Sequence, residues 1–263
     1  MKKARFARTM VALLMVIAPV AASAQGTQTD DFKKAIDSLS ESQKAILKEL
    51  QEIHKLLAQQ GQGRPAADAL PIAPVNVDKE PFKGNPNAKV AVIEFSDFQC
   101  PFCGRYDKDT YPAILKDYVD TGKVKYVWRD YPLDFHQNAE KAAEAAHCAG
   151  EQGKFWDMHD RLFANQQNIA AADLPKHAEA LGLNVSLFQQ CLDSGRFATE
   201  IKKDIADAGG AGISGTPSFL IGVVQPNGSV KITKKLVGAK SYAEFKSAID
   251  SVLMPPGGGG GTR

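Results

Sequence analysis

The sequence lacks the features that would place it in a specialised class of protein. It has only four cysteines in 263 residues, which excludes a small domain held together mainly by disulfides. Its formal net charge is only +2, so its composition does not indicate nucleic-acid binding. The longest apolar run, residues 10–22, is shorter than the roughly 20 residues of a membrane-spanning helix. With 44% hydrophobic and 24% charged residues, the chain has the composition of an ordinary globular protein.

The first 24 residues have the pattern of a secretory signal peptide. A short segment rich in Lys and Arg precedes the apolar run, and the small residues Ala22 and Ala24 mark a cleavage site before Gln25. An uncleaved N-terminal anchor is the alternative, which the short apolar run and its Pro19 disfavour. We therefore predict export, with no membrane insertion after cleavage. The periplasm fits this pattern best, another extracytoplasmic space being the alternative, and disulfides persist there.

Residues 30–58 contain a heptad repeat typical of a coiled coil. Apolar residues recur at alternating spacings of four and three, Gln43 is the one polar interruption, and the segment contains neither Gly nor Pro. The series is Phe32, Ile36, Leu39, Gln43, Ile46, Leu50, Ile53 and Leu57. Leu at a with Ile at d disfavours a two-stranded coil, so we predict a homo-oligomerisation helix within residues 25–62, with a trimer favoured. An amphipathic helix packed on its own domain is the alternative, but a linker predicted at residues 63–83 separates the two.

A strand followed by a Cys-x-x-Cys motif indicates redox chemistry. The β-branched run at residues 89–95 predicts a buried strand, and Cys100-Pro101-Phe102-Cys103 begins a predicted helix that runs to about Asp120. The dipole and the free N–H groups of the helix stabilise a thiolate at Cys100. We therefore expect Cys100 to be the exposed nucleophile and Cys103 the more buried, resolving thiol. Half a zinc site is disfavoured because no second Cys-x-x-Cys is present. An inert disulfide is disfavoured because two cysteines on one helical turn make a labile bridge.

These motifs resemble those of the DsbA-like branch of the thioredoxin superfamily. The resemblance covers about residues 84–254. It rests on the segment 94–103, a strand with residues 128–133, an all-helical middle part, and the segment Gly215–Phe219. It implies an α/β, thioredoxin-like fold with an all-helical insertion at about residues 136–210, preceded here by the N-terminal coiled-coil helix.

The resemblance also assigns roles to particular residues. It implies that Pro217 follows a cis peptide bond beside the redox pair and that the backbone of Thr216 pairs with a bound substrate strand. It implies that Glu94, an ionisable residue in an apolar strand, is a buried acid that moves the proton of the resolving thiol. For Glu94 the alternative is a partly exposed acid, or one paired with a base such as Arg129. Asp97 is expected to be a turn or cap residue.

The other two cysteines, Cys148 and Cys191, lie in two predicted helices. In an oxidising compartment a structural disulfide is the leading interpretation. A second exchange-active pair is disfavoured because neither cysteine begins a Cys-x-x-Cys helix, and two buried free thiols remain as the third possibility. We find no phosphate-binding loop and no Ser-His-Asp set, and we expect no cofactor and no metal site.

The remaining elements are predicted from hydrophobic periodicity and from Gly and Pro breaks. Five helices are expected between residues 139 and 208. Two strands at Ser218–Val224 and Val230–Leu236 form a predicted hairpin, and an amphipathic helix at Tyr242–Leu253 follows. The Gly-rich residues 255–263 are predicted to be a disordered tail.

The sequence thus predicts an enzyme, a periplasmic thiol–disulfide oxidoreductase. Its substrates would be unfolded or wrongly disulfide-bonded exported proteins, and a membrane protein would restore its redox state. Because Phe102 stands where the strongest oxidase of the family has histidine, we expect a milder oxidant. An oligomer with several reduced sites suits an isomerase or reductase and resembles the suppressor-of-copper-sensitivity proteins. A DsbA-type dithiol oxidase is the alternative. From a different class comes a copper-binding or relay protein, since thiolates suit Cu(I).

Overall fold

The computed structural model describes residues 32–52 and 72–254, and these two segments belong to separate units of the chain. In neither segment is there a helix long and apolar enough to cross a membrane. The predicted signal peptide, residues 1–24, and the predicted tail, residues 255–263, lie outside the described residues.

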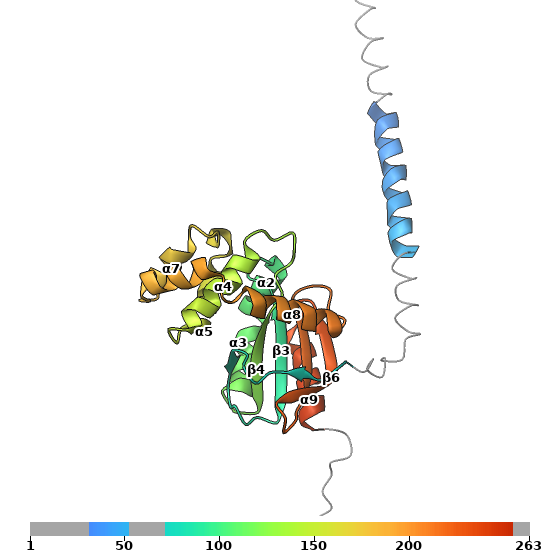
Figure 1. The fold of residues 1–263 in the computed structure, drawn as a ribbon. Coiled ribbons are helices and arrows are strands. Elements are labelled where there is room, and N and C mark those ends of the chain that lie inside the picture. Colours follow the sequence, from blue (N-terminus) through green and yellow to red (C-terminus); the bar gives the residue numbers. More distant parts are fainter. Residues whose placement is uncertain (1–31, 53–71, 255–263) are drawn as a thin grey trace, which may run out of the picture. The chain divides into compact units, whose positions relative to one another are not determined.

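The first unit contains a helix at residues 32–52, as predicted (Figure 1). Its apolar heptad residues face outward: Phe32, Leu39 and Ile46 are between 58% and 68% exposed. The last two heptad positions, Ile53 and Leu57, lie outside the described residues. The helix therefore carries an apolar stripe along one side.

The second unit is built on a mixed sheet of six strands in the order β1-β6-β5-β3-β4-β2. Every residue of β3 (Val90–Ser96) and β4 (Val124–Asp130) is buried, and the two strands pair in parallel. On its other edge β3 pairs with β5 (Ser218–Val224), which forms the predicted hairpin with β6 (Ser229–Val237). The β-branched composition of β3 suits a central strand covered on both faces.

Two short strands extend the sheet at its edges. β1 (Val75–Asn76) pairs with β6, and β2 (Phe82–Lys83) pairs with β4. Val75 and Val77 are buried against the sheet. The folded unit therefore begins before residue 84, and the last part of the predicted linker is a pair of edge strands. A strand of two residues is too short to give a hydrophobic periodicity, which is why the sequence did not reveal it.

Helices cover the sheet and form a separate helical part (Figure 1). The helical elements are α2 (Pro101–Asp109), α3 (Tyr111–Ile114), a π-helical turn (Leu115–Val119), α4 (Ala139–Gly150), α5 (Phe155–Ala164), a 3-10 turn (Gln166–Asn168), α6 (Leu174–Ala180), α7 (Val185–Ser194), α8 (Ala198–Gly210) and α9 (Tyr242–Leu253). The predicted single helix to about Asp120 is thus three pieces. The change of direction comes at Thr110, two residues before Pro112, which lacks the N–H that a continuous helix needs.

Three apolar cores hold these elements together. α2, α3 and α9 share one core with the sheet face that carries Val92 and Tyr126. The end of α8 packs on the opposite face, where Ala208 meets Ile93. The helices between β4 and β5 have a core of their own that includes both Cys100 and Cys103. The architecture confirms the predicted thioredoxin-like α/β fold with an all-helical insertion.

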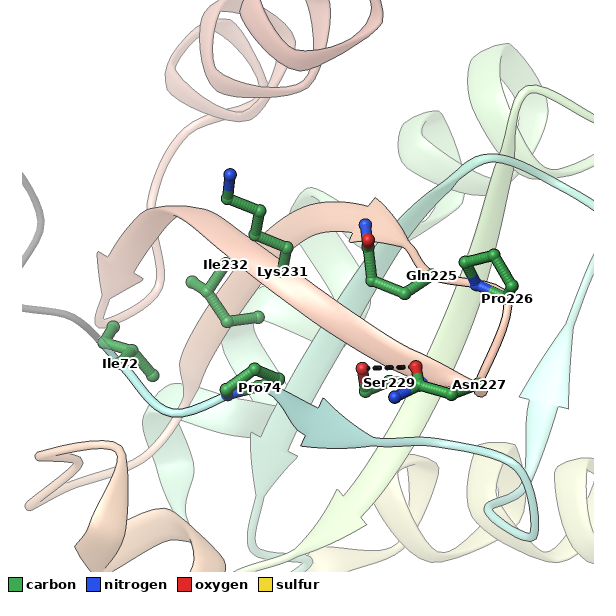
Figure 2. Close-up of a pocket in the computed structure, with 8 residues that line it drawn as sticks. All are labelled: Ile72, Pro74, Gln225, Pro226, Asn227, Ser229, Lys231 and Ile232. Carbon is green, nitrogen blue, oxygen red and sulfur yellow. Dashed lines mark hydrogen bonds between the residues drawn. The ribbon is translucent and has the colours of Figure 1, made fainter.

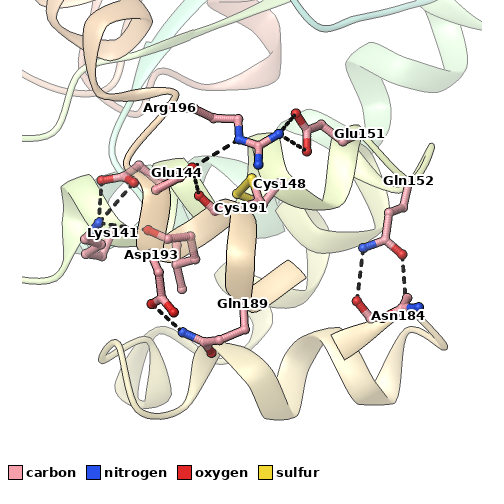
Figure 3. Close-up of a disulfide and its surroundings, with 12 residues drawn as sticks. Lys141, Glu144, Cys148, Glu151, Gln152, Asn184, Gln189, Cys191, Asp193 and Arg196 are labelled. Atoms are coloured by element: carbon pink, nitrogen blue, oxygen red, sulfur yellow. Dashed lines mark hydrogen bonds and ion pairs between the residues drawn. A yellow bond between two sulfur atoms is a disulfide. The ribbon is translucent and has the colours of Figure 1, made fainter. Parts of the chain in front are cut away.

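A disulfide joins two helices of this insertion. Cys148 of α4 and Cys191 of α7 are bonded, with their Cα atoms 5.8 Å apart, and they are 43 positions apart in the chain. Both are buried in the core of the insertion. Polar contacts surround the bridge, among them an ion pair of Arg196 with Glu151 (Figure 3). The disulfide therefore closes a long loop within the insertion.

Replacing both Cys148 and Cys191 by Ala is expected to lower the free energy of unfolding by about 4 kcal/mol, because the unfolded chain loses a closed loop of this length. Urea denaturation of the wild-type and variant proteins, without reductant, measures the difference. Equal urea midpoints for wild type and the Cys148→Ala/Cys191→Ala variant would show that the bridge does not stabilise the fold.

Candidate active site

The redox motif lies where the central strand β3 passes into α2. Cys100 is the N-cap residue of α2, Pro101 is its first residue, and Cys103 lies in its first turn. The Oδ1 atom of Asp97 accepts hydrogen bonds from the backbone N–H groups of Gln99 (2.7 Å) and Cys100 (3.2 Å). Asp97 is therefore a turn residue, as expected, and it fixes the direction in which the chain enters the helix.

Both cysteines of the motif are free thiols, and both are buried. Cys103 is 0% exposed, as expected for a resolving thiol, but Cys100 is only 3% exposed and less accessible than the sequence indicated. The reason is tertiary: the Sγ atom of Cys100 lies 3.6 Å from the carbonyl oxygen of Thr216, to which the protonated form of the thiol donates a hydrogen bond. Access to the sulfur is thus controlled by the loop that contains Thr216.

The two thiols differ strongly in acidity. A hydrogen bond from the Cys103 thiol lowers the pKa of Cys100 to about 5 against the opposing effect of burial. The Thr216 side chain and the backbone N–H groups of Phe102 and Cys103 also lower it. Burial and the neighbouring Cys100 raise the pKa of Cys103 well above its usual value. At neutral pH Cys100 is therefore the thiolate and Cys103 keeps its proton. The Cys100 thiolate is stabilised without a histidine in the motif.

The loop before β5 brings a distant part of the chain to this sulfur. The peptide bond between Thr216 and Pro217 is cis, and Pro217 is buried while Thr216 is partly exposed. The carbonyl oxygen of Thr216 is the atom in contact with Cys100. The fold thus joins the Cys-x-x-Cys turn and the Gly-Thr-Pro loop in one site.

Glu94 of β3 is 2% exposed and lies on the same sheet face as Tyr126. The Tyr126 hydroxyl donates a hydrogen bond of 2.5 Å to its Oε2 atom. Burial raises the pKa of Glu94 to about 8, while the hydrogen bond from Tyr126 and the nearby Ser96 hydroxyl lower it. The charge of Glu94 in turn raises the pKa of Cys103. The carboxyl group is therefore buried and electrostatically coupled to the resolving thiol.

Arg129 is not the partner of Glu94. Successive residues of a strand point to opposite faces, and Glu94 pairs in register with Trp128, so Arg129 lies on the other face. There it is fully buried and forms ion pairs with Asp204 (2.7 Å), Glu80 (3.3 Å) and Asp207. These contacts tie β4 to α8 and to the segment before β2, and they serve the fold rather than the redox pair.

Two further side chains hold the turn that carries Cys100, and the sequence did not indicate either. His136 Nδ1 lies 2.7 Å from Asp97 Oδ2, and Gln166 Nε2 donates to the carbonyl oxygens of Phe98 and Cys100, both at 2.9 Å. A Cβ at Gly104 would lie 2.2 Å from Gln166 Oε1. In the sequence, Gly104 directly after the motif is a weak signal of this close approach. Gln166, which lies in a 3-10 turn of the insertion, gives no such signal.

A group of possible metal ligands lies beside α2 but is already neutralised. Ligand atoms of Asp107, His159 and Asp160 lie within 4.8 Å of one another. His159 Nδ1 is 2.8 Å from Asp160 Oδ1, and the Lys83 ammonium is 3.8 Å from the other oxygen of Asp160. Because a protein cation and a histidine already meet the exposed carboxylate, we assign no metal to this group.

A cavity of about 680 Å³ lies at the turn between β5 and β6, at the opposite end of β5 from Pro217 (Figure 2). Its walls include Ile72, Pro226 and Lys231, and none of its lining residues is a cysteine, a histidine or a carboxylic acid. This cavity is therefore separate from the redox chemistry.

The reactivity of Cys100 gives a direct test of this geometry. In the reduced protein, the rate of alkylation by iodoacetamide is expected to rise with pH with a midpoint near 5, because the thiolate is the reacting form. The variant Cys103→Ala should have a higher midpoint, since it removes the Cys103 hydrogen bond, which is the largest cause of the low pKa. Mass spectrometry of the labelled site measures both rates. A midpoint above pH 8 in the wild type would contradict the site described here.

Comparison with known proteins agrees with this arrangement. A family model described as thioredoxin matches residues 76–251. Disulfide bond formation protein D of Bacillus subtilis is 27% identical over 203 residues, which are 73% of this chain and 83% of that protein. The crystal structure of alpha-DsbA1 of Wolbachia pipientis has a TM-score of 0.60 and 26% identity, and the match covers 68% of this chain and 93% of that one.

A third similarity covers only part of a much longer protein. The Na(+)/H(+) antiporter NhaA 3 of Salinispora tropica is 39% identical over 188 residues, which are 71% of this chain but 28% of the antiporter. This chain spans about a quarter of the length of the antiporters that it matches. The similarity therefore concerns one region of those proteins. The thioredoxin family model extends from the first edge strand to the last helix of the second unit, so the chain belongs to the thioredoxin family. The relatives of similar length place it with the DsbA-like members.

Proposed function

We propose that this protein is a thiol–disulfide oxidoreductase that acts on exported proteins in the periplasm through Cys100 and Cys103. The observation that carries the proposal is the opposite ionisation of the two thiols at the start of α2. Exchange needs an attacking thiolate and a second thiol that resolves the mixed disulfide, and the pair supplies both. The relative named disulfide bond formation protein D supports the same class of reaction.

The exchange proceeds in two displacements. When the protein acts as an oxidant, a substrate thiolate attacks the sulfur of Cys100 in the Cys100–Cys103 disulfide, and Cys103 leaves and takes up a proton. A second substrate thiolate then attacks the substrate sulfur of the mixed disulfide and expels the Cys100 thiolate. The substrate loses two electrons and gains a disulfide, and the protein becomes a dithiol. When it acts as an isomerase, the Cys100 thiolate opens a substrate disulfide and is expelled again after rearrangement, with no net oxidation.

Three neighbours take part in this scheme. Glu94 supplies and accepts the proton of Cys103, because it is buried, its charge acts on that thiol, and its pKa of about 8 is close to working pH. The backbone of Thr216 is partly exposed next to the Cys100 sulfur, where it can pair with an extended substrate segment. Pro217 keeps this loop beside the thiolate and has no N–H group to compete for it.

Two further observations support export to an oxidising compartment. The first 24 residues have the pattern of a signal peptide, and the Cys148–Cys191 disulfide suits the periplasm better than a reducing cytoplasm. A membrane protein with a disulfide or dithiol of its own would then restore the working redox state.

Two features of the protein bear on whether it acts as an isomerase or reductase or as an oxidase, and they favour different answers. The exposed apolar stripe of the helix at residues 32–52 supports a homo-oligomer, and its heptad residues favour a trimer. A trimer can hold several reduced sites around one misfolded substrate, which favours an isomerase or reductase. The low pKa of Cys100 stabilises the reduced form, which makes the disulfide a good donor and favours an oxidase. We place the isomerase first and the oxidase second.

The two directions predict different activities. An isomerase refolds scrambled ribonuclease in a mildly reducing glutathione buffer, and this activity should fall at least tenfold when residues 25–62 are removed. An oxidase instead forms disulfides in reduced ribonuclease, with or without those residues. The Cys100→Ser variant is the control and should be inactive in both assays, because it lacks the attacking sulfur. Equal turnover by wild type and Cys100→Ser would refute the proposed function.

The oligomer has a test of its own. Sedimentation equilibrium of the mature protein should give a trimer, and a variant without residues 25–62 should be a monomer. Ile46→Asp places a charge on the apolar stripe and should dissociate the trimer, whereas the matched control Lys48→Asp, on the opposite side of the same turn, should not. If all four proteins have the same number of chains per particle, the helix does not assemble the chain.

A further inference from the structure

A short chain of hydroxyl groups ends on Glu94. The hydroxyl of Tyr126, from β4, donates to Glu94 Oε2 at 2.5 Å. The hydroxyl of Tyr106, from α2, lies 2.9 Å from the hydroxyl of Tyr126. All three side chains are buried, so no bulk water solvates the carboxylate, and these hydrogen bonds replace it.

The position of the chain links it to the redox pair. Tyr106 follows Cys103 by three residues on α2, so the two side chains lie on the same side of that helix. Glu94 and Tyr126 lie on the sheet face that α2 covers. The carboxyl group is thus hydrogen-bonded to one of the two tyrosines and electrostatically coupled to the resolving thiol.

The groups around Glu94 include no counter-charge in the described part of the chain. From α2 it faces Cys103, Tyr106 and the acid Asp107, whose charge opposes ionisation of Glu94. From α3 it faces Tyr111, and from β3 itself the hydroxyl of Ser96. From β5 its register partner is Phe219, which carries no charge. The ionised form of Glu94 therefore depends on hydroxyl donors, and among the tyrosines the one that donates to it is Tyr126.

We propose that Tyr126, supported by Tyr106, is a positioning residue that keeps Glu94 able to accept the proton of Cys103 by donating a hydrogen bond to the Glu94 carboxylate. The step it serves is the release of a substrate from its mixed disulfide with Cys100. The Cys103 sulfur attacks Cys100 Sγ, the bond from Cys100 to the substrate sulfur breaks, and the substrate leaves as a thiolate. The proton of Cys103 passes to Glu94. The protein dithiol is oxidised by two electrons, and the substrate disulfide is reduced.

This inference rests on the proposed function, and its test uses oxidised glutathione as the disulfide. The oxidation of the reduced protein is followed by the fluorescence of Trp128, which shares a core with both cysteines, between pH 5.5 and 9.5. In the wild type the rate should contain a step with the ionisation of Glu94, near pH 8. Tyr126→Phe should move that step upward by about one pH unit or more and slow the reaction about tenfold at pH 7, because the anion loses its hydrogen bond. Tyr106→Phe should cause a smaller shift in the same direction.

Two controls separate this effect from loss of packing. Glu94→Gln removes the step from the pH profile of the oxidation rate. In this variant, the additional substitution Tyr126→Phe should not change the profile further. Tyr111→Phe removes a neighbouring hydroxyl for which no hydrogen-bond partner is found among the described residues, and it should leave the profile unchanged. A carboxyl carbon NMR titration of Glu94 gives the same shift without use of the reaction, and Tyr106→Phe serves this measurement should Tyr126→Phe not fold.

The outcomes distinguish the two proposals. The role of the tyrosines would be overturned if Tyr126→Phe left both the pH profile and the Glu94 titration as they are in the wild type. It would also be overturned if Tyr126→Phe had the same effect whether or not Glu94→Gln was present. Either result would leave the proposed function standing. A wild-type protein that does not react with oxidised glutathione at any pH would overturn both.

Discussion

The hydrogen bond that Cys103 gives to Cys100 is the interaction on which the site depends. It is the largest cause of the low pKa of Cys100, and it requires the second thiol to keep its own proton. Burial of Cys103 at the start of α2 meets that requirement, because a thiol in an apolar core loses its proton with difficulty. The helix N-terminus then adds backbone N–H groups at Cys100. One thiolate and one thiol, three residues apart in the motif, are therefore a consequence of where β3 ends and α2 begins.

The same ionisation links the redox state to stability. In the folded, reduced protein the pKa of Cys100 is about 5, below the value of about 9 that an unperturbed thiol has. A group with a lowered pKa contributes stability that is complete above its unfolded pKa and is lost as the pH falls through its folded pKa. The reduced form therefore gains stability as the pH rises from about 5 toward 9, whereas the disulfide form has no such group. At neutral pH this difference favours reduction of the Cys100–Cys103 disulfide, which is the property of a disulfide donor.

Much of this arrangement can be predicted from local patterns, and the rest depends on contacts that no local pattern records. The strand at residues 89–95, the Cys-x-x-Cys helix start and the turn at Asp97 each have a signal within a few residues. The low exposure of Cys100 comes from the loop of Thr216. The hydrogen bond to the carbonyl oxygen of Cys100 comes from Gln166 in the insertion. The sequence also indicates that Glu94 is unusual. Its partner had to come from the fold, because strand register decides that a tyrosine and not Arg129 shares its face.

A buried charge is stabilised in different ways on the two faces of the central sheet. On one face Arg129 is surrounded by Asp204, Glu80 and Asp207, so its charge is held by ion pairs that fix β4 against α8. On the other face Glu94 has hydroxyl donors and no cation among the described residues, and its pKa rises to about 8. A strong ion pair would keep Glu94 ionised at every working pH and make it a poor proton donor. Hydroxyl donors stabilise the anion only in part, so both forms of Glu94 are accessible near neutral pH, which is the condition for moving a proton to and from Cys103.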